Sequence, residues 1–446
     1  MFRPFVFCLV MGMSVCTFAQ ESASTGAAVL TLEQAISLAQ ANNRYVKNAL
    51  LAPSIDDDRV AQARTYRFPS LNLYALGSQL LTPVDFSFQR GTFGTFPGIG
   101  PVPAVNTQIH TPLRPTFYGL TQLTQPLSQQ YKIGLNIKQA MLAKLVDEQK
   151  LRAQKHEVAN QVKQAYYTLL QIQSALAASE ESLKFDRELD RTTEQNVAQK
   201  TALKSDSMEV KARVAREEHN NLTLRDSLAT EKERLNVLLG RDIRTDFAVA
   251  EVPEPTAAEG SLEAAQAQAL ASRPELREAH LSVEQAELNR RIKKTQYIPD
   301  VSLTVNNLSI TNVNLLPSNV ATAGVLVTWD PIDWGLRRHE IAAANKVIEQ
   351  SKNSLSETEA QILVDVDGKF RKLLEARSLL HVTELQLEAE REKLRVVMNQ
   401  YEQKTAILKD VLQQRSSLES AANQHTQALL SFWNAKADFE KSVGED

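Results

Sequence analysis

The chain repeats itself, and this duplication constrains its fold more than any other feature. Residues 31–73 align with residues 261–303 without a gap at an offset of 230, and ten of the 43 pairs are identical. In both copies a proline, Pro69 or Pro299, stands where a helical pattern changes into an alternating strand pattern. Self-similarity at a fixed offset is typical of architectures built from one repeated unit.

Two further pairs of segments extend the repeat along the chain. QPL at 125–127 corresponds to DPI at 330–332, and KTALKSD at 200–206 corresponds to KTAILKD at 404–410. Because the three pairs occur in the same order, we predict two copies of a helix-strand-strand-helix-helix unit. The predicted boundaries are 31–239 for repeat one, 240–260 for an equatorial linker and 261–443 for repeat two.

The first 19 residues have the pattern of a secretory signal peptide. Arg3 precedes an apolar stretch, and residues 17–19 (TFA) form a small-x-small cleavage site. Both cysteines lie in this leader, so residues 20–446, a single predicted protomer, offer no disulfide or thiolate chemistry. Those residues carry 49 Lys+Arg against 53 Asp+Glu, a balance that does not indicate a nucleic-acid partner.

Long helices are expected to make up most of both repeats. Apolar residues recur seven apart from Val366 to Tyr401 and again from Val411 to Phe439, a repeat that is typical of helices supercoiled along a narrow seam. The other positions are largely polar, so these helices meet water over much of their surface. The pattern favours a hollow helical assembly over a compact globule.

The lengths of these helices predict their arrangement. No proline interrupts residues 134–199, which corresponds to a helix of ~100 Å at ~1.5 Å per residue. The returning helix at 205–239 covers about half of that length, and a helix at 31–68 has about the missing length. We therefore expect the two shorter helices to stack end to end beside the long one.

Strand signals lie between the helices. Val301, Leu303 and Val305 alternate with polar residues, and this period of two predicts a sheet with one apolar and one polar face. The loop at 81–115 is much longer than its counterpart in repeat two and is rich in Pro, Gly and Phe. The predicted membrane strands are 70–80, 116–125, 300–310 and 320–330.

Four strands from one chain cannot close a barrel, and an open sheet edge in lipid leaves backbone groups without hydrogen bonds. No segment after residue 20 reaches the ~20 apolar residues of a membrane-spanning helix. Closure by strands therefore requires several copies of the chain. Two copies give eight strands, whose side chains fill the interior, whereas three give twelve and leave room for water. A trimer is the smallest arrangement that makes a channel.

Over essentially all of residues 20–446, the chain resembles a known family, the TolC-like outer-membrane efflux and secretion channels. The resemblance is carried by the helix starts LEQAISLA and LEAAQAQA, the helix-to-strand prolines, the strand exits QPLSQQYKIG and DPIDWGLRR, and DVL at 410–412. It implies a homotrimer with a shared twelve-stranded β-barrel in the outer membrane of a Gram-negative-type bacterium. Below the barrel hangs a long α-helical barrel, with the linker at 240–260 in a belt around its middle.

The resemblance also implies a function. The protein would be the passive exit duct of a tripartite efflux pump or a type I secretion system. Its helical tips would dock onto a periplasmic adaptor and an inner-membrane transporter, and outer-membrane lipid would surround the strands. The cargo is not implied, because selection is made by the inner-membrane pump.

The tips of the helical hairpins hold the residues that the resemblance marks for docking and gating. The family has glycine at the tip turn, where this chain has Lys200 and Lys404. Lysine resists the positive φ that glycine accepts, so either the turn is built differently or these lysines remain helical. With Lys204 and Lys409 they are the docking candidates. The gate candidates that the family pattern implies are Tyr401, Asp206 and Asp410, while Ala406 replaces the family's arginine.

Two other groups of residues have competing interpretations. Six aromatic residues near the ends of the strands are expected to form a girdle at the periplasmic membrane surface, rather than ordinary packing; they are Tyr66, Phe68, Tyr131, Tyr297, Trp329 and Trp334. The acidic run at 56–58 could suggest a metal site. Because Ser54 and Asp57 match a capping box after Pro53, we expect a helix start there instead.

No enzyme is predicted, and no cofactor or metal. The sequence has no phosphate-binding glycine loop and no nucleophile elbow. Two other classes of function remain open beside the exit duct. A periplasmic adaptor also contains a long coiled-coil hairpin but usually only one, and a purely structural coiled-coil protein has no use for strand pairs.

Overall fold

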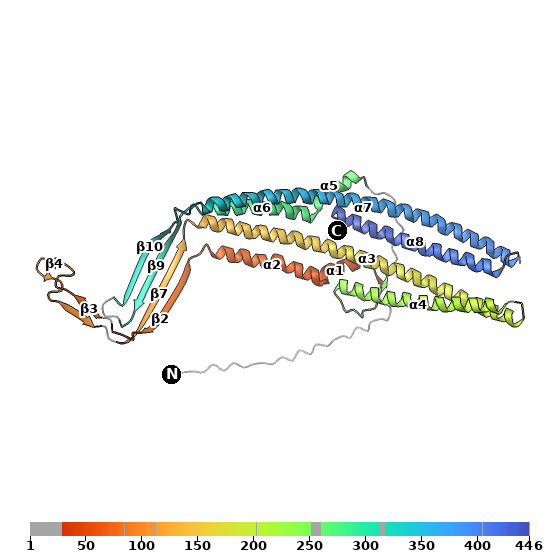
Figure 1. The fold of residues 1–446 in the computed structure, drawn as a ribbon, viewed down its shortest axis with the longest axis horizontal. Coiled ribbons are helices and arrows are strands. Elements are labelled where there is room, and N and C mark those ends of the chain that lie inside the picture. Colours follow the sequence, from red (N-terminus) through yellow and green to blue (C-terminus); the bar gives the residue numbers. More distant parts are fainter. Residues whose placement is uncertain are drawn as a thin grey trace, which may run out of the picture.

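The computed structural model describes residues 29–83, 85–110, 113–201, 203–250, 260–312, 317–403 and 405–445. The predicted signal peptide at 1–19, linker residues 251–259 and Lys404 lie outside these ranges. Within them, long helices run along most of the molecule and a curved sheet stands at one end (Figure 1). The predicted fold class, mainly helical with a small strand part, is confirmed.

The helices of the two repeats have matching lengths. α1 and α5 have 11 residues each, α2 and α6 have 22 each, and α4 and α8 have 36 each. α3 and α7, with 69 and 67 residues, form hairpins with α4 and α8 whose turns point away from the sheet (Figure 1). The helix bounds in repeat one are Leu32–Asn42 (α1), Arg44–Thr65 (α2), Gln130–Ala198 (α3) and Lys204–Leu239 (α4). Those in repeat two are Leu262–Ser272 (α5), Pro274–Thr295 (α6), Leu336–Glu402 (α7) and Leu408–Val443 (α8).

The predicted helix start at Ser54 is wrong, because α2 continues through Pro53 and begins at Arg44. Its cap is Asn43, whose Oδ1 accepts from the Tyr45 N–H at 2.8 Å. Two residues of the acidic run form ion pairs instead. Asp56 is buried and pairs with Arg59 on the next turn at 2.9 Å, and Asp57 pairs with Lys144 of α3 at 2.7 Å.

The predicted end-to-end stacking of the shorter helices is found, and the end of α4 meets the segment that contains α1 and α2. That segment is not one helix, because it is interrupted at Asn43 between α1 and α2. α4 ends at Leu239 and is capped by Gly240, which has φ 68°. A Cβ at Gly240 would lie 2.3 Å from the Asn42 carbonyl oxygen. Only glycine permits both this conformation and this approach. The Asn43 amide also donates to the Leu238 carbonyl at 2.8 Å, so it satisfies one of the carbonyls that the end of α4 leaves open.

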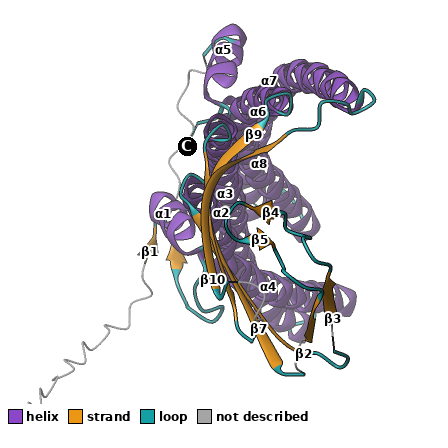
Figure 2. Ribbon diagram, turned by 90° about the vertical axis from the view of Figure 1, so that its left-hand side faces the viewer, coloured by secondary structure: helices purple, strands orange, loops and turns teal. Residues whose placement is uncertain are grey.

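Four antiparallel strands form the sheet in the order β10-β9-β7-β2. Their bounds are Ser70–Gln79 (β2), Pro115–Pro126 (β7), Asp300–Ile310 (β9) and Asn319–Thr328 (β10). The two repeats meet in its centre, where β7 pairs with β9, and in the described sheet β2 and β10 each have one edge without a partner strand. The sheet is curved (Figure 2).

The long loop of repeat one contains two small hairpins. β3 (Asp85–Phe88) pairs with β6 (Thr107–His110), and β4 (Thr95–Phe96) pairs with β5 (Gly100–Pro101). They extend beyond the end of the sheet that is far from the helices (Figure 1). In the other view they lie on the concave side of the sheet (Figure 2).

The largest core cluster lies at mid-length, where α1, α3 and α4 meet. It includes Tyr166, Leu169 and Phe247, each at most 1% exposed. There β1 (Val29–Leu30) pairs in parallel with β8 (Ala248–Val249), and the Tyr166 hydroxyl lies 2.8 Å from the Leu30 carbonyl and 2.9 Å from that of Ala250. None of the helices in the described ranges is both long and apolar enough to cross a membrane.

Candidate channel wall and hairpin tips

The strands present two faces of different chemistry. On β9, Ser302 and Thr304 are 7% exposed while Leu303 and Val305 are 44% and 41% exposed. Curvature crowds side chains on the concave face, so the polar pair faces inward and the apolar pair outward. Leu123 and Val325 lie in register with Val305 and Leu303 and extend the outward apolar face to the neighbouring strands. In this half of the sheet, next to the helices, the alternation is that of a wall between water and lipid.

The tip turn of repeat one uses lysine in the left-handed conformation. Lys200 has φ 59°, and the N–H groups of Lys200 and Thr201 donate to the carbonyls of Val197 at 3.0 Å and Asn196 at 2.9 Å. This is the Schellman pattern that usually ends in glycine. Lys200 is therefore not helical, and it occupies a turn position that glycine fits better. In repeat two the Thr405 N–H donates to the Gln400 carbonyl at 2.9 Å, as Thr201 does.

Asp206 and Asp410 act as caps where α4 and α8 begin. Asp206 Oδ2 accepts from the Leu203 N–H at 3.3 Å, and Asp410 Oδ2 accepts from the Ile407 N–H at 3.1 Å. A carboxylate there also interacts favourably with the positive end of the helix dipole. Tyr401 is 40% exposed, and among the described contacts of one protomer it does not reach Asp206. Lys200, Lys204 and Lys409 are exposed beside these caps.

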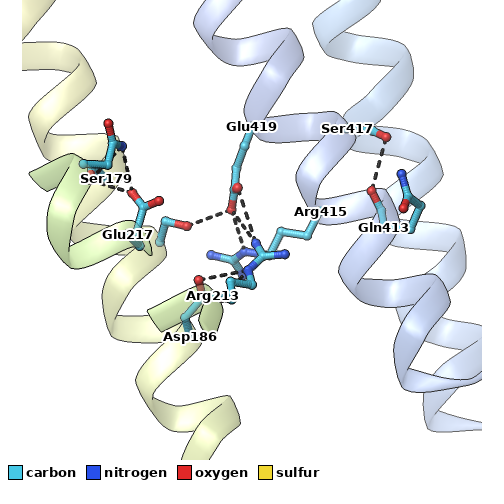
Figure 3. A network of polar contacts seen from close by, with 10 residues as sticks. Ser179, Asp186, Arg213, Glu217, Gln413, Arg415, Ser417 and Glu419 are labelled. Carbon is cyan, nitrogen blue, oxygen red and sulfur yellow. Dashed lines mark hydrogen bonds and ion pairs between the residues drawn. The ribbon is translucent and has the colours of Figure 1, made fainter. Parts of the chain in front are cut away.

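A partly buried polar junction joins the two hairpins above their tips (Figure 3). Arg213 of α4 donates through Nε to both oxygens of Asp186 on α3, at 3.0 and 2.9 Å. Its Nη2 reaches Glu419 of α8 at 3.3 Å. Glu419 also accepts from Ser182 at 2.8 Å, and the Arg415 guanidinium stacks 3.6 Å from the Phe185 ring centroid.

Burial and ion pairing act in opposite directions on the pKa of Asp186. Asp186 is 1% exposed, and burial raises the pKa of its carboxyl more than the Arg213 guanidinium lowers it. Sequence reasoning missed these residues, because 186, 213 and 419 are far apart along the chain. The available signal was the pair Ser179 and Asp186 on α3, which are polar at positions where the 4-3 spacing of Leu176 and Leu183 predicts apolar residues.

The six predicted interface aromatics gather where strands meet helices. Each is at least 50% exposed, and Trp334 is 95% exposed. The Arg337 guanidinium lies 5.6 Å from the Tyr297 ring centroid. In the described part of the chain, no group of three or more His, Cys, Asp or Glu side chains is arranged to hold a metal ion.

Comparison with known proteins identifies the family to which this architecture belongs. The family model described as "Outer membrane efflux protein" matches residues 35–241 and 265–445, which is most of the chain. None of the curated proteins matches this chain.

Solved structures share the fold at low sequence identity. CusC is 15% identical with a TM-score of 0.75, over 95% of this chain and 96% of that one. The Campylobacter jejuni outer membrane channel CmeC is 14% identical with a TM-score of 0.73, over 99% and 94%. VceC from Vibrio cholerae is 16% identical with a TM-score of 0.71, over 93% and 96%. The chain therefore belongs to the outer membrane efflux protein family, and it is a channel protein of the outer membrane rather than an enzyme.

Proposed function

We propose that the protein is the passive exit duct of a tripartite efflux pump or a type I secretion system, and that it works as a homotrimer. The observation that carries this proposal is a two-faced sheet whose outer strands, β2 and β10, have free edges. Pairing β10 of one copy with β2 of the next removes these edges, and three copies give a lumen wide enough for water.

An exposed apolar stripe on α7 supports the same assembly. Val364, Leu374, Leu385 and Val396 are 69%, 45%, 53% and 43% exposed. They recur ten or eleven residues apart, which is about three helical turns, so they lie on one face. A second copy of the chain that covers this stripe buries it. The exposed aromatics at the strand-helix junctions would then lie at the periplasmic membrane surface, where amphipathic rings are favoured.

Chemical cross-linking of the detergent-extracted protein tests the trimer. Products should end at three subunits, and an aspartate in the stripe, Leu385→Asp, should weaken the assembly. The matched control is Leu51→Asp, at an exposed leucine of α2 outside the stripe. A series of products that ends at one or two subunits would refute the shared barrel.

The hairpin tips are proposed as the docking surface for a periplasmic adaptor. Lys200, Lys204 and Lys409 are exposed around the turns, and Lys404 belongs to the same predicted set. Exposed lysines attract an acidic partner and mainly raise its rate of association. Replacing these lysines with glutamate should abolish capture of the adaptor that co-purifies with the native protein. Lys346→Glu with Lys352→Glu, exposed on α7 far from the tips, is the control and should leave capture intact.

The same tips are proposed as the closed gate, with Asp410 from three copies facing the pore. Converging carboxylates repel one another and attract cations, which makes the closed pore cation-selective. Tyr401 would hold the tip shut through Asp206, a hydrogen bond worth ~1 kcal/mol in each copy. In planar bilayers, Tyr401→Phe should raise the open fraction and Asp410→Ala should lower cation selectivity. Tyr45→Phe on α2 is the control, and unchanged behaviour of both gate variants would move the gate elsewhere.

A further inference from the structure

We propose that the outer half of the lumen is an apolar collar that binds the aromatic or aliphatic parts of uncharged organic cargo. The inference rests on the proposed function, because the collar becomes a ring only when three copies close the barrel. It deepens that function by assigning a binding site and a class of ligand to the wall.

The register of the strands places successive rows of side chains on the concave face. Near the helices lie Asp300-Thr328 and Pro126-Ser302-Leu326, followed by two polar or small rows, Ser70-Thr124-Thr304-Gly324 and Asn72-Gln122-Asn306-Thr322. Two apolar or aromatic rows come next and form the collar, Tyr74-Leu120-Leu308-Val320 and Leu76-Tyr118-Ile310, and the polar pair Ser78-Thr116 ends the face.

Burial shows that β9 does not turn over between the two halves. Ile310 in the outer half is 6% exposed, close to the 7% of Ser302 and Thr304 in the inner half. The same crowded face is therefore concave along the whole strand. The outer apolar rows face the lumen, not lipid.

The convex face is apolar near the helices, where Leu71, Leu123 and Val305 are in register. Farther out it is mixed, with the polar pair Ser309 and Asn319 and the exposed aromatic Phe117. The apolar rows of the concave face therefore lie where the convex face is no longer uniformly apolar. Lipid contact explains apolar residues outside but not inside, where a water-filled lumen is normally polar. Apolar side chains that face water are covered favourably by apolar parts of a solute.

The chemistry of the wall identifies the class of solute. Asp300 is the one charged residue in the described residues of β2, β7, β9 and β10, and it lies at the helix end. The collar therefore has no carboxylate, imidazole or thiolate that could bind a metal ion. The two small hairpins lie on the same concave side (Figure 2). Their segment of the chain contains three exposed apolar residues, Phe93, Phe96 and Ile99, at 57%, 49% and 76% exposure.

Matched glycosides test the collar in the reconstituted full chain. Naphthyl β-glucoside and methyl β-glucoside share a neutral sugar and differ in their apolar part. In planar bilayers, naphthyl glucoside should produce excess current noise through wild-type channels and methyl glucoside should not. Leu120→Ser, in the collar, should lower the apparent association constant about tenfold, as expected when a buried apolar contact is lost.

Two further variants keep the test decisive. Leu73→Ser changes a leucine on the convex face of β2 and should leave the noise unchanged, since Leu73 pairs with Thr121 in a row that does not face the lumen. Gln122→Leu extends the collar by one row and should strengthen binding. Equal noise from both glucosides, or from wild type and Leu120→Ser, overturns the collar but leaves the duct standing. A wild-type chain that forms no conducting channel overturns the duct and the collar together.

Discussion

The two repeats build the same helical joint with different side chains. In repeat one, Asn43 both caps α2 and donates to the Leu238 carbonyl at the end of α4. In repeat two these tasks are divided. Ser272 donates to the Val443 carbonyl at 2.7 Å, and Arg273 pairs with Asp365 of α7 at 2.9 Å, while Pro274 at the first position of α6 needs no hydrogen-bonding partner.

Their outer loops differ far more than their joints. The repeat-one loop contains two hairpins, whereas the repeat-two loop spans residues 311–318. A helix end leaves carbonyls that must be satisfied wherever it is buried, so each repeat must solve that problem in some way. A loop beyond the sheet meets water, so no such requirement limits its length.

The largest expected effect concerns the side of the membrane on which these loops lie. Both loops join strands whose other ends lead into helices, so both should face the cell exterior. An epitope inserted at Gly91 or at Asn312 should be labelled on intact cells, while one at Thr201 in the tip should be labelled only after permeabilisation. Protection of both loop epitopes in intact cells would reverse the topology.

The next effect is a difference in stability cost between alanine substitutions at the two glycines that follow α4 and α8, Gly240 and Gly444. At Gly240 a Cβ would meet the Asn42 carbonyl carbon at 2.6 Å and its oxygen at 2.3 Å, whereas at Gly444 it would meet the Ser272 hydroxyl at 2.7 Å. A backbone cannot yield as a side-chain hydroxyl can. Gly240→Ala should therefore cost about 3 kcal/mol and Gly444→Ala about 1 kcal/mol, measured by denaturant unfolding in detergent. Equal costs would show that the two joints are equally tight.

A smaller difference in the free energy of unfolding is expected between Asn43→Ala and Arg273→Ala. Asn43 is 2% exposed, and Asn43→Ala removes both a cap and a long-range hydrogen bond, for about 2 kcal/mol. Arg273→Ala removes ion pairs to Asp365 and Glu275, whose side chains are 40% and 42% exposed, while Arg273 itself is 12% exposed. It should cost about 1 kcal/mol, less than Asn43→Ala. The same unfolding measurement checks both, and a larger loss for Arg273→Ala would contradict the comparison.

The smallest effect is a pH dependence of opposite sign at two aspartates. Burial raises the pKa of Asp186 despite its Arg213 partner. Burial also acts on Asp438, but hydrogen bonds from Lys369, Asn160 and Gln164 outweigh it and lower its pKa. The raised group costs stability as pH rises from its unfolded pKa through its folded pKa. The lowered group contributes stability above its unfolded pKa and loses it as pH falls through its folded pKa.

Unfolding from neutral to acid pH therefore distinguishes the two sites. As the pH falls, wild type should gain stability relative to Asp186→Asn and lose stability relative to Asp438→Asn. Parallel curves for the two variants would mean that neither carboxyl titrates differently in the folded chain.

The sequence alone determined the features that depend on local pattern. Seven-residue spacing identified the long helices, and α3 begins at Gln130, close to the predicted 134. The order of three weak motifs, found twice, identified the family, because a duplicated order is far more specific than any single motif. These features were readable because helix period and strand alternation arise between neighbours along the chain.

Tertiary structure decided what depends on distant residues. Pro53 remains within α2, where local rules predicted a new helix start, because Val46, Asp56 and Val60 are buried along one continuous face. The junction of Asp186, Arg213 and Glu419 brings together three helices, and the position of the apolar rows on the concave face depends on strand register. Long-range pairing sets both of these, and a one-residue shift in register would reverse every face.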